Sequence, residues 1–167
     1  YRTMLTACQE LGEYATSMGV TFAIETGPEP AQVLREFLDD VGSKGIGVNM
    51  DPANLVMVVG DDPVAAVRIL GDFIVHTHAK DGVQLKPCDP EMVYASFAGD
   101  EVPELAATET LFREVPLGEG QVQWDAYLDA LREIGFEGFL TIEREVGENP
   151  ERDIRAAVEF LREKIGR

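Results

Sequence analysis

The sequence has few of the residues on which several common kinds of site depend. It contains two cysteines and two histidines among its 167 residues. Cys8 and Cys88 lie far apart in different contexts, so they predict neither a disulfide framework nor a thiolate metal site, and a reducing compartment suits them. No apolar stretch approaches the roughly 20 residues needed to span a bilayer, and the first residues lack the pattern of a secretory signal. We therefore expect a cytoplasmic protein.

Basic residues are scarce as well. Fourteen lysines and arginines stand against 31 acidic residues, which gives a formal net charge of -17, and the acidic residues are spread along the chain. Phosphate groups are bound mainly through lysine and arginine, so such a surface repels nucleic acid and anionic membranes. We therefore expect neither a nucleic acid nor a membrane as a partner. The same charge favours cations, although a solvated acidic surface that keeps a protein soluble is a simpler explanation for it.

What the sequence does contain is an alternation of helical and strand patterns. A length of 167 residues fits one domain, and 45% hydrophobic residues can build a core. Short apolar runs predict strands at 20–25, 45–51, 73–79 and 138–143. Helical periodicity, with proline and glycine at several of the expected ends, predicts helices at 3–18, 31–41, 62–71, 124–135 and 150–165. Four βα units with apolar strands imply an α/β fold with a parallel sheet, either doubly wound or half of an eight-stranded barrel.

Residues 82–121 interrupt this alternation. They hold four of the nine prolines and show little periodicity apart from a short helix predicted at 103–112. We expect a long loop excursion here, within a single domain that spans residues 1–167. Long irregular loops in compact domains are usually functional or disordered. This one follows the third strand, so it could cover a site as a lid or mediate contact between subunits, and its apolar side chains suit either role (Met92, Val93, Tyr94 and Phe97).

Each predicted strand ends in a side chain that can bind a metal ion. The residues are Glu25, Asp51, His78 and Glu143. In parallel α/β folds ligands bind at the carboxyl ends of the strands, so these side chains should converge. Three carboxylates and an imidazole suit a divalent ion such as Mn²⁺, Mg²⁺, Co²⁺ or Zn²⁺. Any one acid at a strand end could instead cap the next helix or face solvent, but four such residues together favour a metal site.

Both histidines lie at the end of the third strand, one residue apart. Side chains of a strand alternate between its faces, so His76 and His78 point to the same side, which in a barrel is the interior. His78 is nearer the strand end and is the better ligand, whereas His76 should lie one layer lower, beside the ligand or in the core. Asp81 could orient a ligand by hydrogen bonding or form an Asp-Gly turn. Lys80 and Arg144 could bind a substrate hydroxyl or phosphate, or simply carry surface charge.

Five segments, taken in order, resemble a known family. They are "FAIETG", "GVNMDPANL", "IVHTHAKD", "VPLGEGQVQWDAYLDAL" and "GFEGFLTIERE", and together they are similar to the second half of the xylose isomerase-like TIM barrels, the sugar phosphate isomerase/epimerase superfamily. The resemblance covers nearly the whole chain and implies a (β/α)8 barrel in which the four strands are the fifth to the eighth. Four strands cannot close such a barrel. We therefore expect a piece of a longer enzyme whose N-terminal half-barrel is missing here, or else two copies assembled as a homo-oligomer.

The resemblance also implies a set of site residues. In that family a divalent metal is held by a Glu, an Asp, a His and a Glu at the strand ends, which here are Glu25, Asp51, His78 and Glu143. The two glutamates serve as the acid/base pair in the epimerase members. Many members carry a second histidine where this sequence has Asn54, whose amide could instead bind a sugar hydroxyl.

The function that this resemblance implies is a divalent-metal-dependent isomerase or epimerase of a small keto sugar or a related polyol. A proton would leave the carbon beside the carbonyl, and the metal would stabilise the resulting enediolate. Two alternatives stay open. One is a catalytically silent module that binds metal or sugar. The other is an abasic-site endonuclease of the same superfamily, against which the charge of -17 and the presence of only two histidines argue.

Overall fold

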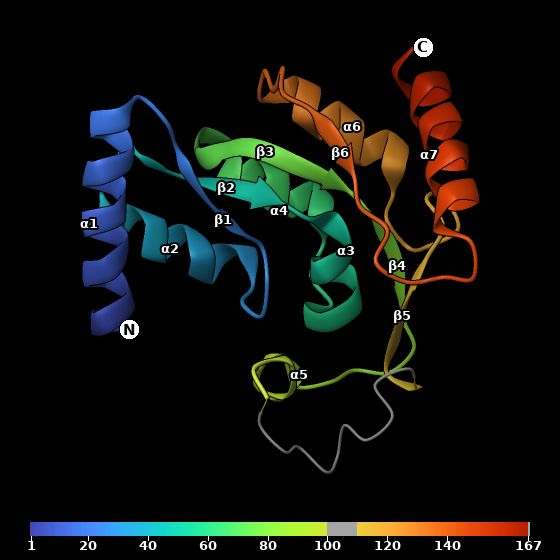
Figure 1. Ribbon diagram of the computed structural model, residues 1–167, viewed down its shortest axis with the longest axis horizontal. Coiled ribbons are helices and arrows are strands. Elements are labelled where there is room, and N and C mark those ends of the chain that lie inside the picture. Colours follow the sequence, from blue (N-terminus) through green and yellow to red (C-terminus); the bar gives the residue numbers. More distant parts are fainter. Residues whose placement is uncertain (100–109, 167) are drawn as a thin grey trace.

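The central element of the protein is a parallel four-stranded sheet (Figure 1). The computed structural model describes residues 1–99 and 110–166. The strands of the sheet lie side by side in chain order and are β1 (Phe22–Glu25), β2 (Ile46–Met50), β3 (Ile74–Ala79) and β6 (Leu140–Ile142). A doubly wound sheet reverses its strand order at a switch point, whereas a barrel keeps it. The order observed here is the one that successive strands of a barrel have.

Helices follow the strands in the order that the sequence predicts. They are α1 (Arg2–Met18), α2 (Ala31–Val41), α4 (Pro63–Leu70), α6 (Trp124–Glu133) and α7 (Pro150–Ile165). Helices α2, α4 and α6 pack against one another in chain order, so they line one face of the sheet (Figure 1). None of the helices in the described ranges has the length and apolar character that a membrane span needs.

Local signals place the ends of these helices. Before α4, the Asp62 side chain accepts a hydrogen bond from the backbone N–H of Val64, and Pro63 occupies the first helical position, where its missing N–H costs nothing. Gly19 ends α1 in the left-handed region, with φ of 70°, a conformation that favours glycine. Apart from the short helix predicted at 103–112, the predicted strands and helices agree with the observed ones to within two residues at each end.

The core lies between the sheet and its helices. Val48 and Met50 of β2 are fully buried, and they belong to one apolar cluster with Leu38 of α2, Val67 of α4 and Tyr127 of α6. Burial of apolar surface is the main favourable contribution to folding, at about 25 cal/mol for each Å². The same packing holds the carboxyl ends of the strands in fixed positions relative to one another.

Short helical segments complete the connections around β2 and β3. Strand β2 leads through Asp51 into α3 (Pro52–Asn54), which continues as the π-helical turn η1 (Leu55–Val59). The 3₁₀ turn η2 (Gly71–Phe73) precedes β3. Within residues 1–99 and 110–166, the two outer strands, β1 and β6, each have a strand neighbour on one side only. In a closed barrel both edges would be paired.

The excursion at 82–121 holds more regular structure than the sequence predicts. Strands β4 (Asp81–Gln84) and β5 (Phe112–Val115) form an antiparallel pair, and α5 (Pro90–Phe97) lies between them along the chain. The paired strands are far apart in sequence, so no local turn signal could predict them. Pro90 begins α5 rather than breaking a helix, because Asp89 caps it.

The short helix predicted at 103–112 is only partly tested by the structure. Residues 103–109 lie outside the described residues. Phe112 is the first residue of β5, so the prediction is wrong at that end. Pairing with Gln84 across the antiparallel ladder fixes Phe112 in a strand, and this tertiary contact overrides a weak local preference.

Candidate metal centre

The carboxyl ends of the four parallel strands bring together the four predicted ligands. One donor atom from each of Glu25, Asp51, His78 and Glu143 lies within 4.8 Å of the other three. The Nδ1 atom of His78 lies 3.6 Å from Glu25 Oε1, 3.3 Å from Asp51 Oδ2 and 3.2 Å from Glu143 Oε2. Four side chains at or just after the ends of four strands thus lie around one place, as expected at the carboxyl edge of a parallel sheet.

The spacing of these donors fits a single divalent ion. Carboxylate oxygens and imidazole nitrogens bind such ions at about 2.0–2.2 Å, so two ligands at tetrahedral or octahedral angles lie about 3–3.5 Å apart. The observed separations of 3.2, 3.3 and 3.6 Å from His78 fall close to that range. Oxygen-rich ligation with one imidazole is also the donor chemistry that Mn²⁺, Mg²⁺, Co²⁺ and Zn²⁺ accept. These residues could therefore hold a divalent metal ion.

Asp51 serves the fold and the site with different oxygens. Its Oδ1 accepts hydrogen bonds from the backbone N–H groups of Ala53 at 2.8 Å and Asn54 at 3.1 Å, which caps α3. Its Oδ2 faces His78. The Thr26 hydroxyl bonds both to the backbone N–H and to the carbonyl of Asp51, each at 2.9 Å. Helix cap and metal ligand, which the sequence presents as alternatives, are therefore compatible in this fully buried residue.

The electrostatic environment of His78 is strongly negative. Its side chain is 13% exposed and faces three carboxylates. Hydrogen bonding to Asp51 and then to Glu25, helped by the charges of Glu143 and Glu25, raises the pKa of His78 to about 10, against the opposing effect of burial. The negative charge of these three carboxylates, which favours a proton on His78, would also attract a divalent cation.

Lys80 lies beside the same cluster and is almost fully buried. Its Nζ donates to Glu143 Oε2 at 2.9 Å and to Glu145, and it lies 3.8 Å from Asp51 Oδ2. Burial disfavours the ammonium, but the charge of Asp51 and the hydrogen bonds to Glu145 and Glu143 outweigh it, so the pKa of Lys80 is raised. The residue therefore stays charged and holds Glu143 in place.

Asn54 and His76 occupy supporting positions. The Asn54 amide donates to Glu25 Oε1 at 3.0 Å and to the Thr26 carbonyl at 3.2 Å, so it orients a predicted ligand. His76 lies on the same side of β3 as His78, with ring centroids 6.0 Å apart. Its Nε2 is 2.9 Å from the Thr141 hydroxyl. His76 thus occupies the layer below the ligands, as strand alternation predicts.

Asp81 is buried, and its carboxylate accepts hydrogen bonds from protein N–H groups. Both oxygens accept N–H groups, namely the backbone groups of Gly82, Gly118, Gly120 and Val122 and the indole of Trp124. A Cβ on Gly120 would lie 2.0 Å from Asp81 Oδ1, so only glycine allows this approach. These hydrogen bonds hold the segment before α6 against the start of β4. None of them involves the four predicted ligands.

Arg144 is likewise engaged by protein groups. Its guanidinium donates to Glu114 at 2.6 Å and to Asp153 at 3.0 and 3.1 Å. Burial opposes the charge, but the hydrogen bonds to Glu114 and Asp153 raise the pKa of Arg144. These contacts join β5 to α7 next to Glu143. A substrate contact for Arg144 stays a prediction, and its observed partners are structural.

Sequence reasoning missed two residues at the site, and it named a third, Tyr94, only as part of the excursion. Asn49 of β2 bonds His78, and Glu145 bonds Lys80. Tyr94 of α5 lies with its ring 3.5 Å from the position that a Cβ on Gly27 would take. Burial, and then the charges of Glu25, Asp51 and Glu29, raises the pKa of Tyr94 to about 12. Alternation along β2 could have found Asn49, because it lies two residues before Asp51 and so shares its side. No local signal places Tyr94 beside Gly27.

Helix α5 reaches the site through a small apolar cluster. Val93 is fully buried against Ala53, Met57 and Val58, which lie just after Asp51 in the chain. This packing puts part of the excursion beside the candidate metal centre. Phe97, at the other end of α5, is 65% exposed. The lid and subunit-contact roles that the sequence allows for the excursion stay predictions.

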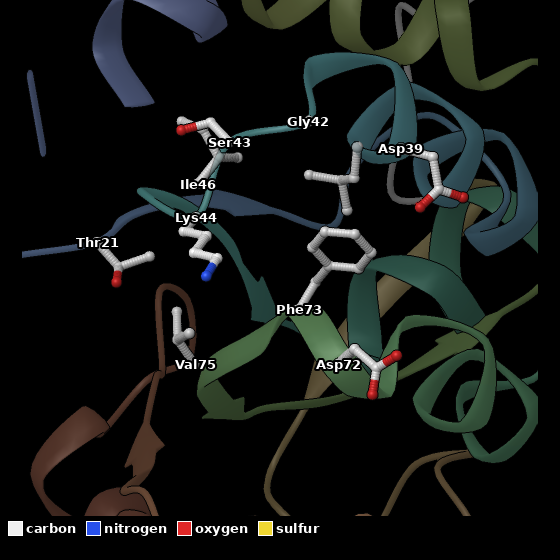
Figure 2. A pocket seen from close by; sticks show the side chains of 10 residues that line it. Thr21, Asp39, Gly42, Ser43, Lys44, Ile46, Asp72, Phe73 and Val75 are labelled. Carbon is white, nitrogen blue, oxygen red and sulfur yellow. The ribbon is translucent and has the colours of Figure 1, made fainter. Parts of the chain in front are cut away.

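A cavity of about 360 Å³ lies at the opposite end of the strands (Figure 2). Its walls come from residues where strands begin, including Thr21, Ile46 and Val75, and its charged groups include Lys44 and Asp72. In barrels of this kind ligands bind at the carboxyl ends of the strands, and the other face serves stability. The cavity therefore takes no part in the candidate metal centre.

Comparison with known proteins identifies the family of this chain. The family model described as the xylose isomerase-like TIM barrel matches residues 1–164. The chain belongs to this family. A crystal structure of a xylose isomerase domain protein from Planctomyces limnophilus is 32% identical, with a TM-score of 0.76, and the match covers 98% of this chain and 51% of that one. The predicted resemblance and the predicted half-barrel fold are thus confirmed.

Two other matches also cover most of this chain but only part of the matched protein. The uncharacterized protein YfiH of Bacillus subtilis (strain 168) is 31% identical over 121 residues, which are 72% of this chain and 38% of that protein. The structure of a D-tagatose 3-epimerase-like protein is 21% identical, with a TM-score of 0.68 over 97% of this chain and 53% of that one. The chain thus spans about half the length, or less, of the proteins that it matches.

Proposed function

We propose that the protein is a divalent-metal-dependent isomerase or epimerase that acts on a small keto sugar or a related polyol. The observation that carries this proposal is the convergence of Glu25, Asp51, His78 and Glu143 at the carboxyl ends of four barrel strands. Membership of the xylose isomerase-like family and the likeness to a D-tagatose 3-epimerase-like protein support the substrate class.

The four ligands divide into two kinds. Asp51 is fully buried and His78 nearly so, and both are held by other protein groups. The side chains of Glu25 and Glu143 are 41% and 30% exposed, so they can also reach a substrate. We assign Asp51 and His78 to holding the ion. When bound, a divalent cation polarises the substrate carbonyl and stabilises negative charge on its oxygen.

We assign proton transfer to the two more exposed residues, Glu25 and Glu143. One carboxylate takes the proton from the carbon beside the carbonyl, and the electron pair of the broken C–H bond passes to the carbonyl oxygen. In an epimerisation, the other glutamate returns a proton to the same carbon from the opposite side, and the carbonyl re-forms. In an isomerisation, the proton goes to the former carbonyl carbon, while the hydroxyl proton of the first carbon passes to the former carbonyl oxygen, so that the carbonyl moves to the first carbon. Asn54 holds Glu25 by a 3.0 Å hydrogen bond, and Lys80 holds Glu143 by one of 2.9 Å. Each carboxylate thus keeps a fixed direction during the transfer.

Conversion of ketoses such as D-tagatose by the purified, Mn²⁺-loaded protein tests this proposal. Glu25→Gln and Glu143→Gln should each abolish turnover while circular dichroism shows an unchanged fold. Glu137→Gln, on the segment before β6, is a matched control that should keep full activity. Normal turnover in either site variant would refute the acid/base assignment.

A further inference from the structure

The side chain of Asn49 has an unusual position beside His78. Its Nδ2 lies 3.1 Å from His78 Nε2 and 3.5 Å from Glu25 Oε2. Its Oδ1 is buried and has no hydrogen-bond partner among the described residues. A buried acceptor without a partner costs roughly 1–3 kcal/mol, so its presence next to a candidate ligand calls for a physical reason.

Strand pairing brings Asn49 to this place. Along β2 and β3 the partners change from Val48 with Ile74 to Asn49 with His76, which leaves Val75 as one extra residue on β3. Such irregularities redirect side chains and are common beside active sites. Asn49 also pairs with Glu25 of β1. Its amide therefore lies between two of the four candidate ligands.

The two nitrogens of His78 face different groups. Nδ1 faces the carboxylates of Glu25, Asp51 and Glu143, so a cation among these acids would take the Nδ1 lone pair. The ring proton must then lie on Nε2. A histidine that binds a metal almost always donates this second N–H to an acceptor, which fixes the tautomer and the ring orientation. Among the residues that the structure describes, the group within hydrogen-bond distance of Nε2 is the Asn49 amide.

We propose that Asn49 is the positioning residue for His78 and that its Oδ1 accepts the Nε2–H when a cation occupies the site. The terminal torsion of asparagine is broad and roughly two-fold, so a half-turn of the amide exchanges Nδ2 for Oδ1 in front of Nε2. That rotation gives the buried oxygen its partner and leaves Nδ1 free for the ion. This inference rests on the proposed metal-dependent function, and it adds a residue that does not touch the metal.

Two substitutions separate the acceptor from the other roles of Asn49. Asn49→Leu keeps the number and branching of the side-chain heavy atoms and removes the acceptor. Asn49→Asp keeps an acceptor but, like leucine, removes the amide donor to Glu25. Isothermal titration of Mn²⁺ into the purified protein should show binding weaker by about 10- to 100-fold for Asn49→Leu. Asn49→Asp should bind at least as tightly as the wild type, with circular dichroism as the folding control for both variants.

A second measurement reads the tautomer directly and leaves Asn49 unchanged. In ¹⁵N spectra of the wild type with diamagnetic Zn²⁺, the proton of His78 should be on Nε2. The chain has only two histidines, so His76→Gln completes the assignment. A proton on Nδ1 in the loaded protein, or equal Mn²⁺ affinity in Asn49→Leu and the wild type, would overturn the inference and leave the proposed function standing. Failure of the wild type to bind Mn²⁺ would overturn both.

Discussion

Replacement of Asp81 by asparagine should destabilise the protein strongly. The buried carboxylate accepts five N–H groups at 2.8–3.2 Å: Oδ1 takes those of Gly82 and Val122, and Oδ2 takes three others, including the indole of Trp124. Asparagine offers one oxygen and one NH₂ group at the same positions. Even in its better orientation, at least two of the five donors would face another donor instead of an acceptor.

The magnitude follows from those two lost bonds. A hydrogen bond to a charged group contributes about 1.5–3 kcal/mol, so the free energy of unfolding should fall by about 3–6 kcal/mol. Domains of this size are stable by about 5–15 kcal/mol in total. Asp81→Asn should therefore lose a large share of its stability, and the segment before α6 should detach from β4 first.

Urea unfolding measures this loss, with the fluorescence of Trp124 as a local probe because it is the one tryptophan of the chain. Circular dichroism provides the global probe. Asp39→Asn is the matched control, since Asp39 forms an exposed pair with Arg35 four residues away, a kind of pair that contributes about 0.3–0.5 kcal/mol. A variant Asp81→Asn within about 1 kcal/mol of the wild type would refute the reasoning.

Two further predictions concern the rim of the site and its support. Tyr94→Phe should raise the KM for a ketose by roughly fivefold, the equivalent of one hydrogen bond of about 1 kcal/mol, and an unchanged KM would remove Tyr94 from the substrate site. Hydrogen bonding to Arg152, against the effect of burial and with help from Arg144, lowers the pKa of Asp153 below its usual 3.8. Its contribution to stability is therefore present above that value and is lost as the pH falls through the lowered pKa. Urea unfolding at pH 6 should show Asp153→Asn to be less stable than the wild type, and the difference should shrink towards pH 3; a constant difference would contradict the ionic role.

The sequence predicts the positions of the metal-ligand candidates because each depends on a local signal. Glu25, Asp51, His78 and Glu143 each follow a short apolar run, and parallel strands in chain order bring such ends together. Alternation along one strand is also enough to put both histidines on one face. These features need no knowledge of distant contacts.

The remaining parts of the site depend on contacts between distant segments. Asp81 binds backbone groups about 40 residues further along the chain, so "AKDG" alone indicates only a turn. The antiparallel pair β4 and β5 and the docking of Val93 on η1 are likewise products of tertiary packing. Asn49 is polar on a buried strand, a signal that could have been noticed, but its partner His78 is 29 residues away.

Deuterium incorporation from D₂O tests the central claim most directly. The wild-type protein, loaded with Mn²⁺ and incubated with D-tagatose or another ketose that it binds, should introduce deuterium at the carbon beside the carbonyl. Removal of the metal with EDTA, or the substitution Glu143→Gln, should abolish this exchange. A protein that binds both Mn²⁺ and the ketose but leaves every C–H bond unexchanged would contradict proton transfer and would indicate a binding module instead.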